Sequence, residues 1–271
     1  MTDAGVDASD TRPAADQSGG RIAVHDLTVT FHDRSGSGTT ALEDLELIVE
    51  PGQIVSIIGP NGCGKSTMLR VMAGLIRPAR GDVLLDDDPI LGPDPRIGLV
   101  FQEPRLLPWR SVARNIAYPA ELAGLDRATR ERRVDELLAR VGLQAARDLL
   151  PSQLSGGMRQ RAALARALAL EPGVLLLDEP FSALDALTRE RFNVELLKLW
   201  GRLRTTIVLV THSIPEAIFL GDRVVVLSAR PGRVVADIPV PFSRPRTIDL
   251  LDASAFSATA RLVRERLEAD A

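Results

Sequence analysis

The chain has 271 residues, 45% of them hydrophobic, and a formal net charge of −3. This length and composition suffice for one or two domains with a sizeable core, and the acidic balance argues against a nucleic-acid partner. No run of about 20 apolar residues could span a bilayer, and the acidic start MTDAGVDASD lacks the basic and apolar regions of a signal peptide.

The first fifty residues predict a tail followed by two strands. Residues 1–20 are rich in Asp, Ala, Ser and Gly without periodicity, which is typical of a disordered tail. Apolar and polar residues alternate from Arg21 to Phe31 and again from Ala41 to Val49, the pattern of two strands in a small antiparallel sheet. Phe31 could stack on an adenine ring, or it could be an ordinary strand-end aromatic packed in the core.

A glycine-rich loop then joins a strand to a helix. The β-branched run Ile54–Ile58 precedes it, and apolar residues at helical spacing, from Met68 to Leu75, follow it. The loop has the pattern G-x-x-x-x-G-K-[ST], formed by Gly59, Pro60, Asn61, Gly62, Cys63, Gly64, Lys65, Ser66 and Thr67. Its glycines let backbone N–H groups approach a polyphosphate, and the helix adds its positive N-terminal end. Lys65 supplies a charge for the β- and γ-phosphates, and the Ser66 hydroxyl suits Mg²⁺.

Cys63 lies inside this loop and is the chain's single cysteine. One cysteine excludes an internal disulfide and is compatible with a reducing cytoplasm. We interpret it as a small filler residue, with a redox switch as the alternative.

The next segment predicts two more strands. A turn is expected at 78–81, a short strand at 83–85, and a solvated acidic turn at 86–88. Ile97–Phe101 predicts a strand that ends at Gln102. Residues just past a strand in an α/β sheet lie where ligands bind, so Gln102 is a candidate site residue.

Residues 103–153 predict helices rather than strands, inserted into the α/β core. A helix is expected to begin at Ser111, and Asp126 can cap a longer one that spans Arg127–Val141. An apolar cluster stands near the start of this segment, at Leu106, Leu107, Pro108 and Trp109. Such a cluster is either core or an exposed surface for a partner, and we favour the partner.

A second potential phosphate cradle follows at Leu154–Arg161, LSGGMRQR, which opens a helix expected to end at Leu170. Ser155, Gly156 and Gly157 offer a hydroxyl group and unpaired N–H groups at the helix N-terminus. One chain with one nucleotide has little use for two cradles. We therefore expect each cradle to complete a site begun by the glycine-rich loop of another subunit.

Two strand ends carry the candidate catalytic groups. The apolar run 174–177 ends in Asp178, which fits a second Mg²⁺ contact, and Glu179 is placed to polarise a water for attack on the γ-phosphate. His212 follows the strand predicted over Thr206–Val210 and is expected to contact the γ-phosphate. A helix is expected between them, over 186–203.

The remainder predicts a short helix capped by Ser213, two closing strands at 224–227 and 234–238, and a break at 241–245. A terminal amphipathic helix is expected over 254–267.

The ordered motifs GPNGCGKST, Gln102, LSGGMRQR, LLLDEP, SALD and His212 resemble the ATP-binding subunits of ABC transporters over residues 21 to about 245. The resemblance implies an α/β fold: a P-loop NTPase core with a mostly parallel sheet, an N-terminal antiparallel β-subdomain and an inserted helical subdomain at about 103–170. Residues 246–271 would form a C-terminal helical extension. It also implies that Glu179, His212 and Lys65 are catalytic, that Phe31 stacks on adenine, that Gln102 also contacts the metal, and that 182–185, including Asp185, contacts ATP.

Three finer stretches, LLPWRSVARNI, DALTRE and LSARPGRVV, resemble the nitrate, sulfonate and taurine importer group. That resemblance implies a subunit that hydrolyses ATP with Mg²⁺ and forms a homodimer around it. It also implies a peripheral position on the cytoplasmic face of the membrane, with a separate permease contacting Leu106–Trp109. A solute-binding protein would be an indirect partner.

Other classes with a phosphate loop fit less well. A DNA-repair or chromosome-structuring ATPase would need a long coiled coil between Gln102 and Leu154, where no sustained heptads occur. Translation-associated ATPases usually carry two such cassettes, and a nucleoside kinase has no LSGG. A purely regulatory module would not need Glu179 and His212 together.

Overall fold

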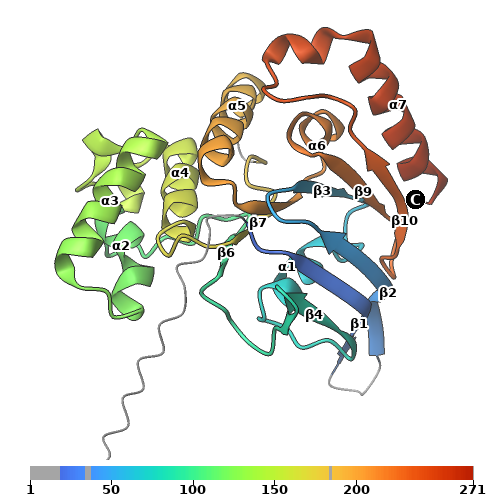
Figure 1. Ribbon diagram of the computed structural model, residues 1–271, viewed down its shortest axis with the longest axis horizontal. Helices are drawn as coiled ribbons and strands as arrows, with labels where there is room; N and C mark the ends of the chain where they lie inside the picture. Colours follow the sequence, from blue (N-terminus) through green and yellow to red (C-terminus); the bar gives the residue numbers. More distant parts are fainter. Residues whose placement is uncertain (1–18, 34–37, 183–184, 271) are drawn as a thin grey trace, which may run out of the picture.

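The computed structural model describes residues 19–33, 38–182 and 185–270. It contains two sheets and a group of helices to one side (Figure 1). The predicted tail at 1–20 lies almost entirely outside the described residues.

The smaller sheet is antiparallel, with the order β2-β1-β4-β5. Its strands are β1 (Ile22–His32), β2 (Gly38–Val49), β4 (Arg80–Leu85) and β5 (Asp88–Pro89). The antiparallel pairing of the first two strands is confirmed. The sequence did not predict that β4 would join them, and β4 begins at Arg80, so the turn expected at 78–81 is too long.

The larger sheet has the order β10-β9-β3-β8-β7-β6, and its strands are parallel except at the β10 edge. Its strands are β3 (Ile54–Ile58), β6 (Ile97–Val100), β7 (Val174–Asp178), β8 (Thr206–Val210), β9 (Arg223–Leu227) and β10 (Val234–Pro239). β3, β7 and β8 are buried along their whole length, which explains why most of their residues are apolar.

The side chains of each central strand pack into two cores, one on each face of the larger sheet. In β7, for example, Val174 and Leu176 point to one core, and Leu175 and Leu177 point to the other. The first core is shared with the antiparallel sheet and α1 (Lys65–Met72). The second is shared with α5 (Ala186–Leu203), α6 (Ile214–Leu220) and α7 (Ser254–Ala269), which lie on the opposite side (Figure 1).

Three helices form a separate block beside the larger sheet: α2 (Val112–Leu122), α3 (Arg127–Val141) and α4 (Gly156–Ala167) (Figure 1). The predicted cap of α3 is confirmed, because the Asp126 side chain accepts a hydrogen bond from the first turn of that helix. Ser111, where a helix was expected to begin, caps α2 in the same way. The predicted bounds of α3 are also confirmed. α4 ends three residues before the expected Leu170. Short 3-10 helices occur at Gln144–Ala146, Pro151–Gln153 and Ile248–Asp252.

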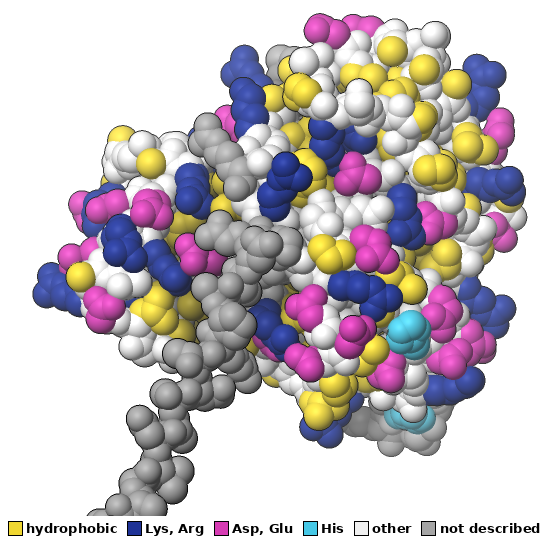
Figure 2. All heavy atoms as spheres, in the orientation of Figure 1, with side chains coloured by type: hydrophobic (Ala, Val, Ile, Leu, Met, Phe, Trp, Pro, Cys, Tyr) yellow, Lys and Arg dark blue, Asp and Glu magenta, His cyan; other side chains and the backbone are white. Residues whose placement is uncertain are grey.

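The surface shows no single sign of charge on the face in Figure 2, where acidic and basic side chains are intermixed. Many charged side chains of the described residues form ion pairs, such as Arg223 with Asp237 and Arg96 with Asp94. Among the described residues, no helix is long and apolar enough to cross a membrane.

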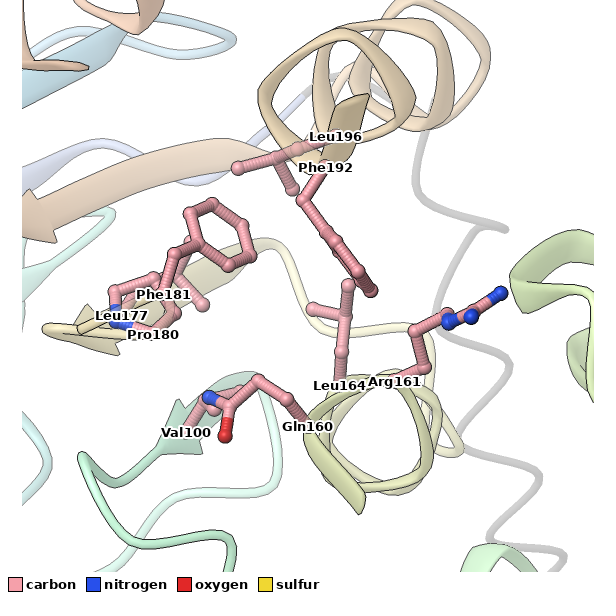
Figure 3. Close-up of a pocket in the computed structure, with 9 residues that line it drawn as sticks. All are labelled: Val100, Gln160, Arg161, Leu164, Leu177, Pro180, Phe181, Phe192 and Leu196. Carbon is pink, nitrogen blue, oxygen red and sulfur yellow. The ribbon is translucent and has the colours of Figure 1, made fainter. Parts of the chain in front are cut away.

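The helical block meets the core through apolar side chains at the edge of the larger sheet. Figure 3 shows Leu164 of α4 near Phe192 of α5, with Leu177 and Phe181 from β7 and the turn after it. The rings of Phe181 and Phe192 lie 5.6 Å apart between centroids. This apolar contact joins α4, which carries the second cradle, to the strand that carries Asp178.

The sequence predicted a break in regular structure at residues 241–245. Hydrogen bonds from Arg246 hold this segment against the core. The Arg246 guanidinium is buried and its Nη1 donates to the carbonyls of Ile218, Phe219 and Gly221 at 3.0, 3.0 and 2.7 Å. Its Nε and Nη2 donate to the carbonyl of Phe242. Arg246 thus satisfies carbonyls at the C-terminal end of α6, which otherwise lack partners within the helix. Burial and the neighbouring Arg244 lower its pKa to about 10.

We predict that Arg246→Met lowers the free energy of unfolding by about 3 kcal/mol, because it leaves several buried carbonyls without a donor. Chemical denaturation measures this loss. The control, Arg264→Met on the exposed side of α7, should change stability by less than about 0.5 kcal/mol. Equal effects of the two substitutions would show that Arg246 does not anchor this segment.

Candidate functional site

The glycine-rich loop connects β3 to α1, and its backbone shape requires a glycine at position 64, just before α1 begins. Gly64 has a φ of +110°, outside the range of ordinary residues. A Cβ atom there would stand 2.6 Å from Leu42 Cδ2 and 2.8 Å from the Ala41 carbonyl oxygen. The loop therefore packs directly on β2, and this fixes the direction in which the first N–H groups of α1 point.

The ammonium group of Lys65 lies over the loop that precedes it. Nζ donates to the carbonyl oxygens of Gly59 at 2.8 Å and Pro60 at 2.9 Å. The buried Cys63 sulfur is 3.9 Å away, which fits the interpretation of Cys63 as a filler. A cation at the N-terminal end of a helix, beside unpaired N–H groups, is suited to a polyphosphate.

Ser66 and Asp178 meet next to this cation. The Ser66 hydroxyl donates to Asp178 Oδ1 at 2.9 Å. Burial raises the pKa of the Asp178 carboxyl, and the negative charge of Glu179 adds to this, while the Ser66 hydrogen bond opposes it. Two oxygens on adjacent corners of a Mg²⁺ octahedron are about 3 Å apart. The spacing and the hard oxygen donors therefore fit Mg²⁺.

Glu179 contacts Gln102 and His212, the other two site residues that were predicted at strand ends. Its Oε2 is 3.3 Å from the donating Gln102 Nε2 and 3.0 Å from His212 Nδ1. Its backbone φ is +44°, a conformation that non-glycine residues adopt mainly in strained or functional positions. β6, β7 and β8 thus bring Gln102, Glu179 and His212 together, as expected. A contact between Gln102 and a metal stays a prediction.

Phe31 is 45% exposed at the end of β1. The alternative in which it packs in the core is therefore wrong. An exposed aromatic ring is free to stack on a base, and this role stays a prediction.

Ser155 is the N-cap of α4, and its Oγ accepts a hydrogen bond from the Met158 N–H at 3.2 Å. Ser155 and Gly156 are exposed at this helix N-terminus, as a cradle for a second molecule requires. Of the predicted segment 182–185, Ala183 and Leu184 lie outside the described residues. Asp185 caps α5 by accepting from the Thr188 N–H.

The cluster at 106–109 is mostly on the surface. Trp109 is 73% exposed and Pro108 is exposed, whereas Leu106 packs partly against the core. Asn115 is a buried residue of α2 that the sequence analysis did not identify. Its side chain holds the loop at 106–109 through hydrogen bonds. It accepts from the Leu107 N–H and donates to the carbonyls of Leu107, Arg110 and Ser111. The polar residue in an otherwise apolar helical pattern was the available signal.

A second missed residue, Arg230, supports the glycine-rich loop. Its Nε and Nη2 donate to the Gly62 carbonyl at 3.1 and 3.0 Å. The two residues are 168 positions apart in the sequence, so no local pattern points to this contact. Arg230 thus fixes the direction of one carbonyl of the loop.

Glu216 is the third missed residue, and it lies buried behind His212 at the start of α6. Burial raises its pKa to about 7, although a hydrogen bond with Thr211 and the charges of Arg189 and His212 oppose the shift. The charge of Glu179 acts in the same direction as burial. A buried carboxyl one turn from a site residue could have been suspected from its place in an apolar helix.

Residues 42–182 match the family described as ABC transporter. The aliphatic sulfonates import ATP-binding protein SsuB 2 of Burkholderia cenocepacia is 50% identical over 83% of this chain and 81% of its own length. The taurine import ATP-binding protein TauB of Roseobacter denitrificans is 42% identical over 82% of this chain and 83% of its own length.

Two solved structures share the fold. One is a dimeric post-hydrolysis state of an ATP-binding cassette bound to ADP and Pi, with a TM-score of 0.73 and 33% identity. The alignment covers 82% of this chain and all of that chain. The other is cbiO1 of Clostridium perfringens, part of the ABC transporter complex cbiONQ. It has a TM-score of 0.72 and 28% identity over 90% of this chain and 98% of its own.

We predict that Glu216→Gln stabilises the protein increasingly as the pH rises. The pKa of Glu216 is raised from its ordinary 4.5 to about 7 on folding, so the wild type loses stability between these pH values as the unfolded chain ionises first. The difference in unfolding free energy should grow by roughly 2–3 kcal/mol and level off above pH 7.

Chemical denaturation of both proteins at a series of pH values makes this measurement. Glu195→Gln is the matched control, because Glu195 is exposed on α5. It should give no comparable slope. A constant difference for Glu216→Gln across the range would contradict the assigned burial effect.

Proposed function

The chain belongs to the ABC transporter family, and we propose that it is the ATP-hydrolysing subunit of an importer. The observation that carries this proposal is the pair of contacts Ser66–Asp178 and Glu179–His212 beside the glycine-rich loop. They supply, at one sheet edge, oxygens for Mg²⁺ and a positioned carboxylate for a water. A nitrate-, sulfonate- or taurine-like solute is supported by the names of the relatives and by the stretches 106–116, 185–190 and 227–235.

Binding of ATP would use groups that are already in place. The backbone N–H groups of residues 61–67 and the Lys65 ammonium would surround the β- and γ-phosphates, and Phe31 would stack on the adenine ring. Lys65 would exchange its carbonyl partners, Gly59 and Pro60, for phosphate oxygens. Ser66 and Asp178 would hold Mg²⁺, which neutralises phosphate charge when bound.

Hydrolysis would depend on Glu179 as the general base. Its carboxylate would take a proton from a water that attacks the γ-phosphate. Gln102 and His212 both contact Oε2, so they orient the carboxylate before ATP arrives. We propose that His212 also contacts the γ-phosphate, because its side chain is half exposed and free to turn from Glu179.

A second copy would complete the site. The Ser155–Gly157 cradle of one subunit would face the glycine-rich loop of the other, with ATP between them. The exposed helix N-terminus at Ser155 supports this arrangement. Loss of the γ-phosphate would remove a contact that both subunits share and favour opening.

A separate permease would dock on Leu106–Trp109, and the subunit would lie at the cytoplasmic face of the membrane. The exposed Trp109 on a loop fixed by Asn115 supports this docking surface. Asn115 gives the loop a defined shape, and a defined shape lowers the entropy cost of binding. A solute-binding protein would act on the permease rather than on this chain.

We predict that Glu179→Gln abolishes ATP turnover but leaves an ATP-dependent dimer. The amide cannot act as a base at neutral pH, and the substitution removes a negative charge near the γ-phosphate. Steady-state phosphate release and size-exclusion chromatography with light scattering, with and without ATP and Mg²⁺, measure the two effects. The wild type should be mostly monomeric because it consumes the bridging ATP.

The double variant Glu179→Gln with Ser155→Arg is the control, since the bulky side chain should block the cradle and leave monomers. Monomeric Glu179→Gln protein at high ATP would argue against the shared site. Turnover at the wild-type rate would argue against the role of Glu179.

We predict that Trp109→Ala leaves the basal ATPase of the isolated subunit intact but weakens capture of the subunit by its permease about tenfold or more, as truncation of a central aromatic anchor does. Leu91→Ala is the matched control, because Leu91 is 78% exposed but lies outside the cluster. Quantitative co-purification with the permease distinguishes them. Equal recovery of both variants would show that Trp109 does not contact the permease.

A further inference from the structure

A pocket of about 180 Å³ lies between α5, α6 and the 3-10 helix Ile248–Asp252. It is separate from the contacts of Lys65, Asp178 and Glu179 described above. Residues three and four apart on one helix share a face, so Glu190 and Asn193 of α5 face it together, as do Glu216 and Phe219 of α6. Its volume is enough for several water molecules or a small ligand.

Two buried polar residues of the lining, Asn193 and Glu216, carry hydrogen-bond acceptors, and we call this part of the lining the buried end of the pocket. Asn193 is 7% exposed, and its Oδ1 has no hydrogen-bond partner among the residues that the structure describes. Glu216 is 4% exposed. A buried acceptor without a donor is costly, and most such groups in proteins are paired with a residue, a water or a ligand. The Asn193 amide oxygen therefore indicates a donor that the described residues do not supply.

The charge around Glu216 indicates what kind of donor this is. Arg189 lines the pocket, but its Nε donates to the Phe181 carbonyl at 3.3 Å, and burial outweighs its charge in setting the pKa of Glu216. Arg189 and Glu190 carry opposite charges and leave the more exposed end without a net charge. A cation with several N–H donors and no acceptor complements the two acceptors at the buried end.

The remaining walls are apolar except at Ser213, whose Oγ accepts a hydrogen bond from the Glu216 N–H. Pro215 and Phe219 come from α6, and Ile248 and Leu251 come from the C-terminal segment. This segment is held against α6 by Arg246, so the apolar wall is built into the fold. A ligand here would need a short hydrocarbon part beside its charged group.

From these contacts we propose that the pocket binds a small organic ammonium ion, with its N–H groups on Asn193 Oδ1 and the Glu216 carboxylate and its alkyl group against Phe219 and Leu251. Nothing in this proposal depends on ATP hydrolysis. The proposed ligand site lies between α5 and α6.

The test uses isobutylammonium chloride as the probe and saturation-transfer difference NMR on the full chain. We expect saturable binding to the wild type with an apparent Kd of about 1 mM, given the few atoms of the probe. Isobutanol, which has the same shape without the charge, should bind at least about tenfold more weakly.

Asn193→Leu should weaken isobutylammonium binding about tenfold or more, because it removes the unpaired acceptor and keeps an apolar side chain. Glu216→Gln should do the same and serves as the second variant if Asn193→Leu does not fold. Glu195→Gln, on the exposed side of α5, removes an equal charge outside the pocket and should leave the affinity unchanged.

Three results would overturn the proposal. One is an absence of saturable binding to the wild type, and another is equal affinity for isobutanol and isobutylammonium. The third is unchanged affinity in both pocket variants, or an equal loss in Glu195→Gln.

Discussion

The site depends on the register of the parallel strands in the larger sheet. Ile57 of β3 and Asp178 of β7 both pair with Val210 of β8, and Val100 of β6 pairs with Leu177. The strands therefore end at one level, and the residues that follow them meet at one edge. A slip of one residue would turn each strand's side chains to the opposite face and separate Ser66 from Asp178.

The polar groups at this edge are paired with one another before any ligand arrives. Lys65 binds the loop carbonyls, Ser66 binds Asp178, and His212 and Gln102 share Glu179. The first two pairings satisfy the buried Lys65 and Asp178, which would be costly to leave without partners. ATP and Mg²⁺ would therefore exchange one set of contacts for another, and the raised pKa of Asp178 marks a carboxyl suited to gaining a cation.

Local patterns in the sequence predicted most of the elements and the meeting of three candidate site residues. Asp126 and the apolar spacing of α3 gave that helix its bounds, and the strand ends placed Gln102, Glu179 and His212 together. Contacts between distant segments left no such pattern. The pairing of β4 with β1 and the support of Gly62 by Arg230 depend on how the chain folds back, and periodicity carries no information on this.

The central claim is that one ATP site is built from two chains, and subunit complementation tests it directly. Lys65→Ala and Ser155→Arg chains are each expected to be inactive alone. In a mixed dimer both defects fall in one site and leave the other intact, so an equimolar mixture should recover up to about a quarter of wild-type ATP turnover. If each site were built within one chain, the mixture would stay as inactive as its components, and that result would contradict the account.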